Sequence, residues 1–349
     1  MEWIDAMRGF TMILVVAYHV NYHGFGHMWY YSPSQSMFML FRMPLFFFIS
    51  GFLAYRASQV WTTGELGRLL LKKLRVQVVP TLVFFTLYIM AFHHDWPSAW
   101  WDSWNAPTKA GYWFTIALLY MFVVYYVFAF IESKLRLRSW IPIALLFVVA
   151  LVLYETCYMP RHFSWALGYR GQENELIVNS SLRQAMINFP YFVLGNIFHR
   201  YWQQAQRFLE AKWLLPLLVV VFVVSALDFF RWQALRMEWR NLSQTLARYS
   251  LLLIVFMSFR YYQNHFSKAT RLGHVLQFIG RRTLDIYLLH FFLLPDMHEI
   301  GVYFKAHPHN FVADTTLSVA VALIIIAFCL VASAVLRVSP VLKKWLFGR

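Results

Sequence analysis

The sequence contains few cysteines and few charged residues. Its 349 residues include two cysteines, Cys157 and Cys329, which lie in different apolar segments. Two separated cysteines provide neither a disulfide framework nor the closely spaced pairs of a zinc site. Charged residues make up 13% of the chain, whereas ordinary soluble domains contain roughly 25%. This shortage argues against a soluble globular protein.

Acidic residues are especially scarce, at 16 against 31 lysines and arginines. An excess of positive charge also occurs in nucleic-acid-binding proteins. Here, however, the cations form short clusters between apolar segments, which is typical of membrane topology signals. We therefore predict a lipid bilayer and no nucleic acid as partner. No small-residue cleavage site follows the first apolar segment, so we expect that segment to be retained as a span.

The chain is instead rich in hydrophobic residues, at 60%, and in aromatic residues, at 20%. Ten apolar segments are each long enough to cross a bilayer core, which takes about 20 helical residues. They are 7–24, 36–55, 76–95, 111–131, 139–158, 184–201, 213–230, 244–262, 278–295 and 314–337. We therefore predict an all-α integral membrane protein, a bundle of about ten transmembrane helices, with a single domain over 1–349.

The distribution of lysine and arginine predicts the orientation of these spans. With a cytoplasmic N-terminus, about two thirds of the cations fall in the cytoplasmic segments, as the positive-inside rule requires. We therefore expect a multi-pass protein of the inner (plasma) membrane with both termini in the cytoplasm. The tryptophan-rich segment 93–107 would then lie at the outer interface.

The first apolar segment carries an arginine and a histidine at an informative spacing. Ten residues separate Arg8 from His19, so after about three helical turns both side chains lie on one face. Asp5 is one turn before Arg8, and His23 is one turn after His19. Ionisable groups within a membrane are costly and usually face a cavity or a partner. This stripe is therefore a candidate functional site.

Simpler explanations exist for each of these residues. Arg8 could be a positive-inside anchor, and His19 could form a structural hydrogen bond between helices. His19, His23 and His27 follow the spacing i, i+4, i+8 of a possible metal site. No acidic ligand is nearby in the sequence, and the predicted helix ends close to Gly24. We therefore expect no bound metal.

Four stretches resemble the membrane-bound acyltransferase-3 family. "IDAMRGFTMILVVAYHV" (4–20) resembles its first span, in which an arginine and a histidine are also ten residues apart. "FRMPLFFFISGFLAYR" (41–56) resembles its second span, and "KKLRVQVVPT" (72–81) its basic cluster before a proline. "GRRTLDIYLLHFFLLP" (280–295) resembles a late span with a Tyr-Leu-x-His pattern. The resemblance extends over essentially the whole chain.

This resemblance implies an O-acyltransferase, specifically an O-acetyltransferase of cell-envelope glycans. The donor would be cytosolic acetyl-CoA or another acyl-CoA, used as a co-substrate, with no permanently bound cofactor. The acceptor would be a hydroxyl of an extracytoplasmic polysaccharide or a lipid-linked sugar. His19 and Arg8 match the catalytic pair of the family. A neutral histidine near the bilayer midplane suits a general base, because its pKa lies near neutrality.

The basic cluster Lys72, Lys73 and Arg75 would bind the phosphates of the donor. The family often has Arg-x-x-Arg here, whereas this chain has Lys72 in the first place and Arg75 in the second. Lysine keeps the charge but lacks the planar fork that binds phosphate through two hydrogen bonds. The alternative is a plain positive-inside loop.

Several polar residues in the outer halves of the spans are expected to line an acceptor cavity. They are Arg42, His23, Glu155, Tyr287 and His290. Arg42 lies within an apolar segment and would require a carboxylate or a polar cavity; Glu155 is a possible partner. Alternatively, Arg42 extends to the outer interface.

Two other classes of function are compatible with the same residues. A transporter or flippase for a polar or lipid-linked substrate could use a buried arginine and histidine for binding or proton coupling. A membrane scaffold without catalysis is the third possibility. The single strong histidine-bearing span has no counterpart at a pseudo-symmetric position, which disfavours an inverted-repeat transporter. The sequence specifies no oligomeric state.

Overall fold

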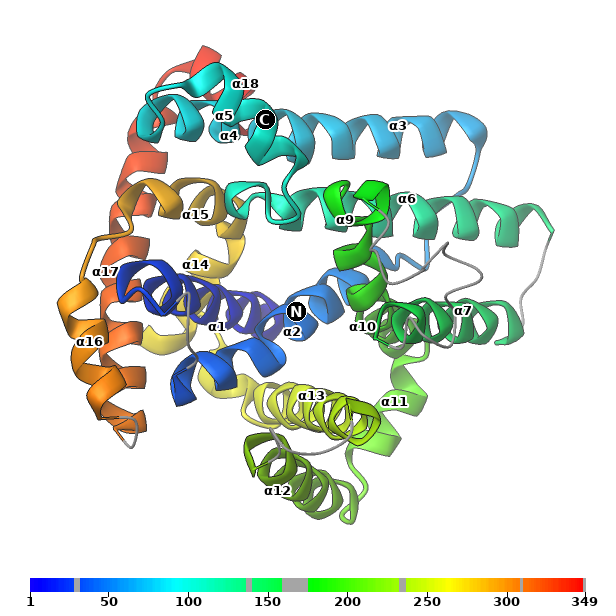
Figure 1. Ribbon diagram of the computed structural model, residues 1–349. Coiled ribbons are helices and arrows are strands. Elements are labelled where there is room, and N and C mark those ends of the chain that lie inside the picture. The colour runs from blue at the N-terminus through cyan, green and yellow to red at the C-terminus, as the bar shows by residue number, and fades with distance from the viewer. Residues whose placement is uncertain (28–31, 136–139, 159–174, 232–236, 308–309, 348–349) are drawn as a thin grey trace. The chain divides into compact units, whose positions relative to one another are not determined.

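The chain is helical throughout the residues that the structure describes. The computed structural model describes residues 1–27, 32–135, 140–158, 175–231, 237–307 and 310–347, and within these ranges it contains helices and no strand (Figure 1). Long apolar helices are expected in a bilayer, because only internally hydrogen-bonded segments can cross hydrocarbon. The all-helical prediction is thus confirmed for the described residues.

Among the described residues, five helices are long and apolar enough to cross a membrane. They are Ser34–Ala54, Thr63–Phe92, Trp113–Lys134, Leu242–Tyr261 and Phe311–Leu336. A sixth span is obtained if Trp202–Leu209 and Leu214–Leu227, which meet at an angle of 75°, count as one. The prediction of about ten spans is therefore not confirmed.

The segment 278–295, which was predicted to be one span, shows one reason why the structure has fewer candidate spans than predicted. Helix α14 (Arg271–Arg281) ends at Arg282, whose φ of −116° and ψ of 20° are not helical. Helix α15 (Thr283–Leu289) follows and continues into the 3-10 turn η5 (His290–Leu293). A continuous apolar pattern in the sequence is thus divided into short helical pieces. The shorter apolar helix Thr283–Leu293 falls below the length of a full span.

The described residues form two compact units. Unit 1 contains Met1–Ile49 and Gln203–Ala334, and unit 2 contains Ser50–Trp202 and Val335–Arg349. The continuous helix α2 (Pro33–Ala54) contributes residues to both units. A unit defined by contacts need not be a separately folding domain, so a single domain over 1–349 stays a prediction.

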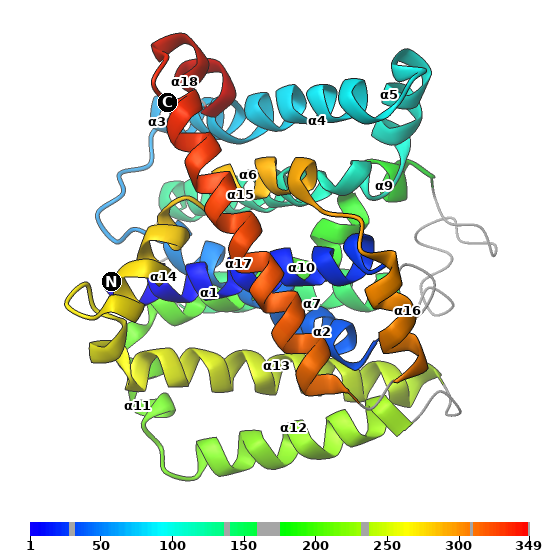
Figure 2. The ribbon, with the colours of Figure 1, turned by 90° about the vertical axis from the view of Figure 1, so that its left-hand side faces the viewer.

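Unit 1 is built around the N-terminal helix. Its elements are α1 (Glu2–His19), the π-helical turn η1 (Val20–Gly24), most of α2, α11 (Trp202–Leu209), α12 (Leu214–Arg231), α13 (Met237–Tyr261), the 3-10 turn η4 (Gln263–Phe266), α14, α15, η5, α16 (His298–Ala306) and α17 (Phe311–Leu336). Helix α1 packs along α14, and α12 packs along α13. Figures 1 and 2 both show α12 beside α13 and α16 beside the long helix α17.

The start of α1 is attached to the segment before α14. The Glu2 carboxylate accepts a hydrogen bond from the Lys268 backbone N–H at 2.9 Å and pairs with Lys268 Nζ at 3.3 Å. The backbone hydrogen bond lowers the pKa of the Glu2 carboxyl. These contacts join two ends of unit 1 that are distant in the sequence.

Unit 2 contains the middle of the chain and its C-terminal segment. Its elements are the end of α2, α3 (Thr63–Lys73), the π-helical turn η2 (Leu74–Val78), α4 (Val79–Phe92), α5 (Trp96–Asn105), the 3-10 turn η3 (Lys109–Gly111), α6 (Trp113–Lys134), α7 (Ile141–Tyr158), α9 (Glu175–Asn179), α10 (Leu182–Arg200) and α18 (Pro340–Phe347). Helix α10 packs against α6 and α7.

Two contacts at the end of α10 hold unit 2 together. His199 Nδ1 donates to the Phe52 carbonyl at 2.6 Å, and the two rings stack with centroids 4.4 Å apart. The Arg200 guanidinium binds the Glu132 carboxylate through two hydrogen bonds of 2.7 and 2.8 Å. Such a bidentate pair fixes orientation as well as charge. The end of α10 is therefore joined to both α2 and α6.

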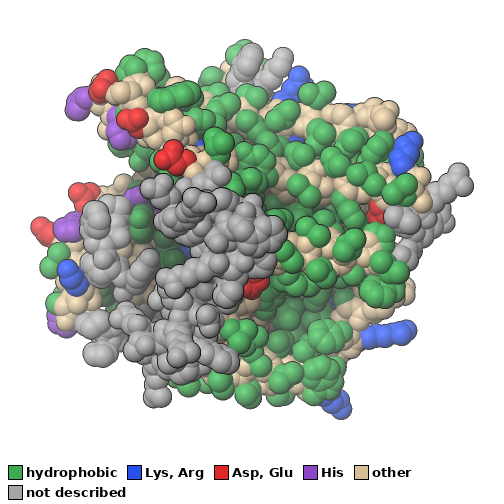
Figure 3. All heavy atoms as spheres, turned by 45° about the vertical axis from the view of Figure 1, so that its right-hand side comes forward, with side chains coloured by type: hydrophobic (Ala, Val, Ile, Leu, Met, Phe, Trp, Pro, Cys, Tyr) green, Lys and Arg blue, Asp and Glu red, His purple; other side chains and the backbone are tan. Residues whose placement is uncertain are grey.

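The surface of the helices is predominantly apolar. On α12, exposed hydrophobic side chains include Val220 and Val224, and on α17 they include Ile324, Phe328 and Val331. Figure 3 shows hydrophobic side chains gathered over the right-hand part of the face in view, where few charged side chains appear. Soluble monomers rarely expose continuous apolar patches of this kind. Together with the spanning helices, this surface identifies a multi-pass membrane protein.

Candidate active site

Helix α1 presents Arg8 toward the beginning of α15. Arg8 donates to Thr283 Oγ1 at 3.1 Å and to Asp5 Oδ1 at 3.4 Å. About a third or less of each side chain in the Arg8–Asp5 pair is exposed, at 27% and 32%. Regular α-helical geometry continues from Glu2 to His19, so Arg8 and His19 share one face of α1.

At the other end of α1, His19 lies in a cluster of rings. Its ring centroid is 5.1 Å from that of His290, 4.9 Å from that of Phe291 and 5.8 Å from that of His23. The α15–η5 segment therefore follows the polar face of α1, with Thr283 at Arg8 and His290 at His19. The structure brings together the predicted residues Arg8, His19, His23 and His290 along one helix pair.

His290 is held in one tautomer by the backbone. Its Nδ1 lies 2.8 Å from the Tyr287 carbonyl and 3.1 Å from the Ile286 carbonyl. A carbonyl only accepts, so Nδ1 must carry the hydrogen, and in a neutral ring Nε2 then has a free lone pair. Both His290 Nε2 and His19 Nδ1 are buried and without a hydrogen-bond partner among the described residues. Two nitrogen atoms are thus available for proton transfer inside unit 1.

The predicted acceptor residue Tyr287 lies beside this cluster. Its ring is buried and 5.9 Å from that of His290. Asp285, two residues earlier on α15, accepts a hydrogen bond from Ser333 Oγ on α17 at 2.7 Å. This contact connects α15 to α17.

Close contact between glycines sets the position of α1 against α14. A Cβ atom at Gly280 would lie 1.8 Å from the Asp5 carbonyl oxygen, and one at Gly9 would lie 2.0 Å from the Leu276 carbonyl oxygen. Only hydrogen fits at these two crossing points. Small residues commonly permit such close helix packing in membranes. The same packing determines how far α15, which follows α14 directly, lies from His19.

A π-helical turn follows His19 and includes Asn21 and His23. Asn21 Nδ2 donates to Ser318 Oγ on α17 at 2.5 Å, and the Met297 backbone N–H donates to the Gly24 carbonyl at 2.8 Å. Wider turns of this type often occur at functional sites. Because the turn changes the helical phase, His27 does not continue the stripe of His19 and His23.

Asp314 lies beside this turn as a buried carboxylate. It accepts hydrogen bonds from Ser34 on α2 and from Ser318 one turn along α17. Asn21 contacts both serines. This network connects η1, α2 and α17. Sequence analysis missed it, because hydroxyl and amide side chains at positions 21, 34, 314 and 318 form no local motif.

Arg42 is buried on α2, also in unit 1. Its guanidinium lies 3.4 Å above the centroid of the Tyr18 ring, and NH1 donates to the Phe38 carbonyl at 3.4 Å. Only 9% of the residue is exposed, so it does not extend to the interface as the alternative explanation proposed. Arg42 is close enough to His19 to influence it electrostatically.

The predicted partner of Arg42, Glu155, belongs to a different unit. Glu155 lies on α7 in unit 2. The described contacts of Arg42 are with Phe38 and Tyr18 instead. A role for Glu155 in an acceptor cavity stays a prediction.

The predicted donor cluster lies in unit 2, within a long helix. Helices α3 and α4 join through η2 into one helix, Thr63–Phe92, so the expected start of the span at 76 was too late. Lys72 and Arg75 are exposed, and Lys73 Nζ lies 3.2 Å above the Phe122 ring centroid. The π turn ends just before Pro80, whose missing N–H removes one α-helical hydrogen bond.

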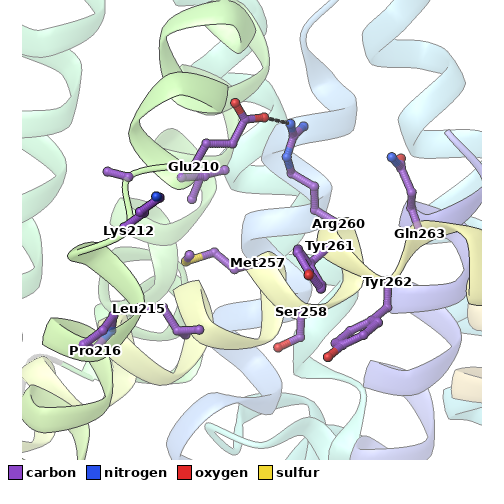
Figure 4. Close-up of a pocket in the computed structure, with 12 residues that line it drawn as sticks. Glu210, Lys212, Leu215, Pro216, Met257, Ser258, Arg260, Tyr261, Tyr262 and Gln263 are labelled. Carbon is purple, nitrogen blue, oxygen red and sulfur yellow. Dashed lines mark hydrogen bonds and ion pairs between the residues drawn. The ribbon is translucent and has the colours of Figure 1, made fainter.

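A cavity of about 670 Å³ lies elsewhere in unit 1, at the bend between α11 and α12 (Figure 4). Arg260 at the end of α13 points toward Glu210, and the two form an ion pair of 2.6 Å. The cavity is lined by Leu209, Glu210, Ala211, Lys212, Leu215, Pro216, Met257, Ser258, Arg260, Tyr261, Tyr262 and Gln263. None of these residues was predicted to act in the site, and none belongs to the histidine cluster.

The family assignment follows from a match over nearly the whole chain. The acyltransferase-3 family model, described as an acyltransferase domain, matches residues 1–338. The chain belongs to the acyltransferase-3 family. The resemblance seen in the sequence is confirmed, and the protein is an acyltransferase that transfers groups other than aminoacyl groups. No curated protein and no solved structure matches the chain.

Because the chain belongs to the acyltransferase-3 family, the histidine cluster is a candidate catalytic site. Among the described residues, no group of three or more His, Cys, Asp or Glu side chains is placed to hold a metal ion. The side chains that meet around His19 are instead the imidazoles of His23 and His290 and the ring of Phe291. His19, Arg8 and His290 were predicted from the sequence, whereas Thr283 becomes relevant only through its contact with Arg8 across two helices.

Proposed function

We propose that this acyltransferase-3 protein transfers an acetyl group from cytosolic acetyl-CoA to a hydroxyl of an extracytoplasmic or lipid-linked glycan. His19 is the general base, and Arg8 orients the polar face of α1 or contacts the donor. The protein resides in the inner (plasma) membrane with both termini in the cytoplasm.

The observation that supports this proposal is the contact between His19 and His290. Their ring centroids are 5.1 Å apart, and each ring has a buried nitrogen without a partner among the described residues. Buried polar atoms are normally hydrogen-bonded, so exceptions call for a functional explanation. An acceptor hydroxyl placed beside His19 would donate its hydrogen to the unpaired Nδ1 of that ring. Family membership favours acyl transfer over transport, and this geometry is compatible with a general base.

The proposed reaction is a direct transfer. His19 takes the proton from the acceptor hydroxyl while the hydroxyl oxygen attacks the thioester carbonyl carbon. The tetrahedral intermediate collapses, the carbon–sulfur bond breaks, and the thiolate of CoA leaves. The imidazolium of His19 returns its proton to the thiolate, so the ester and free CoA are the products. A neutral imidazole near physiological pH is suited to both steps.

The donor is proposed to dock through its phosphates on Lys72, Lys73 and Arg75. Lys72 and Arg75 are exposed, which suits them to contact a large anionic ligand. Charge-assisted hydrogen bonds to phosphate are stronger than neutral ones. The flexible pantetheine arm then brings the thioester to His19.

The test uses the full chain in lipid nanodiscs with acetyl-CoA labelled in its acetyl group. Release of free thiol and transfer of label to isolated envelope glycan are measured in parallel. We expect both, with thiol release dependent on glycan. Full thiol release without label on any glycan would contradict the proposed acceptor, and the absence of both would contradict the proposed reaction.

Neutralising Lys72 and Arg75 together should raise the KM for acetyl-CoA by about ten- to hundredfold, because each phosphate contact contributes a charge-assisted hydrogen bond. The KM for the acceptor should change little. The difference in KM between the variant and the unmodified protein should shrink at high salt, since salt screens the attraction that the variant has already lost. Steady-state kinetics of Lys72→Gln/Arg75→Gln at two salt concentrations measures this.

The matched control for that variant is Arg207→Gln/Lys212→Gln. Both control residues are exposed cations in unit 1. We expect the control to keep the KM of the unmodified protein. If the KM for acetyl-CoA changes equally in the two double variants, the effect is due to overall charge, and Lys72 and Arg75 are not part of the donor site.

The proposed topology predicts that reporters at both termini are cytoplasmic. An alkaline phosphatase fusion, active only outside, should be inactive after Arg349, while a cytoplasmic fluorescent reporter should be bright there. The physical reason is the concentration of lysine and arginine in the predicted inner segments. An active phosphatase fusion at the C-terminus would invert the assignment of donor and acceptor sides.

A further inference from the structure

Arg42 is a buried cation whose charge lacks a carboxylate among the described residues. Its 9% exposure leaves little contact with solvent. Its guanidinium contacts are the Phe38 carbonyl and the face of Tyr18, and its Nε has no hydrogen-bond partner within the described part of the chain. A buried guanidinium with incomplete hydrogen bonding is unfavourable. Such a group is expected to bind an anion during function.

The surroundings of Arg42 strengthen its positive potential. Arg248 on α13 is also buried, with 9% exposed, and repels the Arg42 charge. Arg42 is also an electrostatic neighbour of His19. The Arg42 guanidinium lies over the ring of Tyr18. Tyr18 directly precedes His19, and the centroids of the Tyr18 and His19 rings are 5.2 Å apart. An anion at Arg42 would therefore lie next to the proposed base.

The chemistry of the donor excludes its phosphates as this anion. In acetyl-CoA the pantetheine arm separates the thioester from all phosphate groups. If the thioester carbonyl is at His19, the phosphates are separated from His19 by the length of the pantetheine arm. The acetyl group itself is uncharged. The remaining molecule at His19 is the acceptor.

We infer that the acceptor carries a negative charge, a carboxylate or phosphate on the same sugar as the reacting hydroxyl or on its neighbour, and that Arg42 binds this charge. The inference rests on the proposed function, since it places the acceptor hydroxyl at His19. Arginine suits the task because its planar fork matches carboxylate and phosphate geometry. The preferred substrates are then acidic glycans, such as uronic-acid or phosphate-bearing polymers, rather than neutral ones.

The test compares two acceptors that differ only in charge, methyl glucuronide and its neutral amide, methyl glucuronamide. Methyl glucoside 6-phosphate tests phosphate in place of carboxylate. Binding is measured as the thermal shift of the full chain in nanodiscs, and transfer is measured with labelled acetyl-CoA. We expect the unmodified protein to bind at least one charged sugar about ten- to hundredfold more tightly than the amide, as expected for hydrogen bonds to a charged group.

Variants at position 42 identify the residue responsible. Arg42→Met should abolish the preference for charge, and Arg42→Lys should retain part of it. Without a sugar, Arg42→Met should be no less thermally stable than the unmodified protein, because it removes a buried charge that lacks a carboxylate. The control Arg271→Met replaces an exposed arginine of the same unit and should keep the full preference.

Three outcomes would overturn the inference. The first is that the unmodified protein binds the charged sugars and the amide equally, or binds none of them. A uniform loss of kcat in Arg42→Met for charged and neutral acceptors would instead assign Arg42 to the thioester carbonyl. Dependence on Arg42 that appears only with succinyl-CoA would assign it to a charged acyl group. Binding that depends on Arg42 without any acetyl transfer would support the anion site and contradict the proposed function.

Discussion

Replacing His19 with alanine is expected to abolish acetyl transfer while the protein still inserts and folds. A general base contributes about 10²- to 10⁴-fold to a rate, and His19 is the histidine within α1, the helix that carries Arg8. The cavity left by the ring is bordered by His290 and Phe291, so some local loosening is expected. The measurement is the turnover of labelled acetyl-CoA by His19→Ala, with thermal unfolding as the check on folding.

The matched control for His19 is His23→Ala, one turn further along the same segment. His23 stacks on His19 with centroids 5.8 Å apart, so its loss should perturb packing to a similar extent. We expect His23→Ala to retain most of the turnover. Near-normal turnover in His19→Ala, with loss in His290→Ala, would transfer the role of base to His290, whose Nε2 is also available.

Gly280→Ala is expected to have a large effect on the structure of unit 1. The new Cβ would lie 1.8 Å from the Asp5 carbonyl oxygen and 3.0 Å from the Gly9 nitrogen. Backbone atoms cannot move aside as a side chain can, so α1 and α14 must separate. Inserting one carbon into a packed core costs about 1–3 kcal/mol and occasionally more. Thermal unfolding in nanodiscs should show a clear decrease in Tm.

The same substitution should also reduce activity in the protein that remains folded. Arg8 reaches Thr283, and His19 reaches His290, across the interface that Gly280 sets. A shift of α14 moves α15 with it, because only Arg282 lies between them. Misplacement of catalytic groups by about 1 Å can lower a rate by about a hundredfold.

Gly67→Ala on α3 is the control for this prediction. A Cβ at Gly67 would have nothing within 4 Å. Alanine is favoured over glycine within a helix by roughly 0.5–1 kcal/mol, so this variant should unfold at the same or a higher temperature. If the Tm of Gly280→Ala changes no more than that of Gly67→Ala, then α1 and α14 are not in close contact at Gly280.

The sequence by itself determined the chemical class of the chain and the face of its first helix. Low charge and long apolar segments require a helical membrane protein, because hydrocarbon leaves the backbone no partner but itself. The spacing of Arg8 and His19 is a local property, since ten intervening residues in a regular α-helix return to the same face. The resemblance to the acyltransferase-3 family also rested on short motifs of this kind.

Other features were decided only by the tertiary structure. The π turn after His19 is stabilised by Ser318 and Met297, both distant in the sequence. The break at Arg282 interrupts an apolar pattern that predicts one continuous span. Hydropathy sums over a window and cannot detect where packing against another helix favours a kink over a straight helix.

The pairing of His19 with His290 and the isolation of Arg42 were likewise decided by packing. The glycines at positions 9 and 280 allow α1 and α14 to approach closely, and this approach brings residues 271 positions apart into contact. Whether a buried arginine meets a carboxylate depends on which helices neighbour it. From the sequence, Glu155 was a possible partner of Arg42. The structure surrounds Arg42 with Tyr18, His19 and Arg248. Local periodicity fixes the direction of a side chain on its own helix, but only the packing of helices determines what that side chain meets.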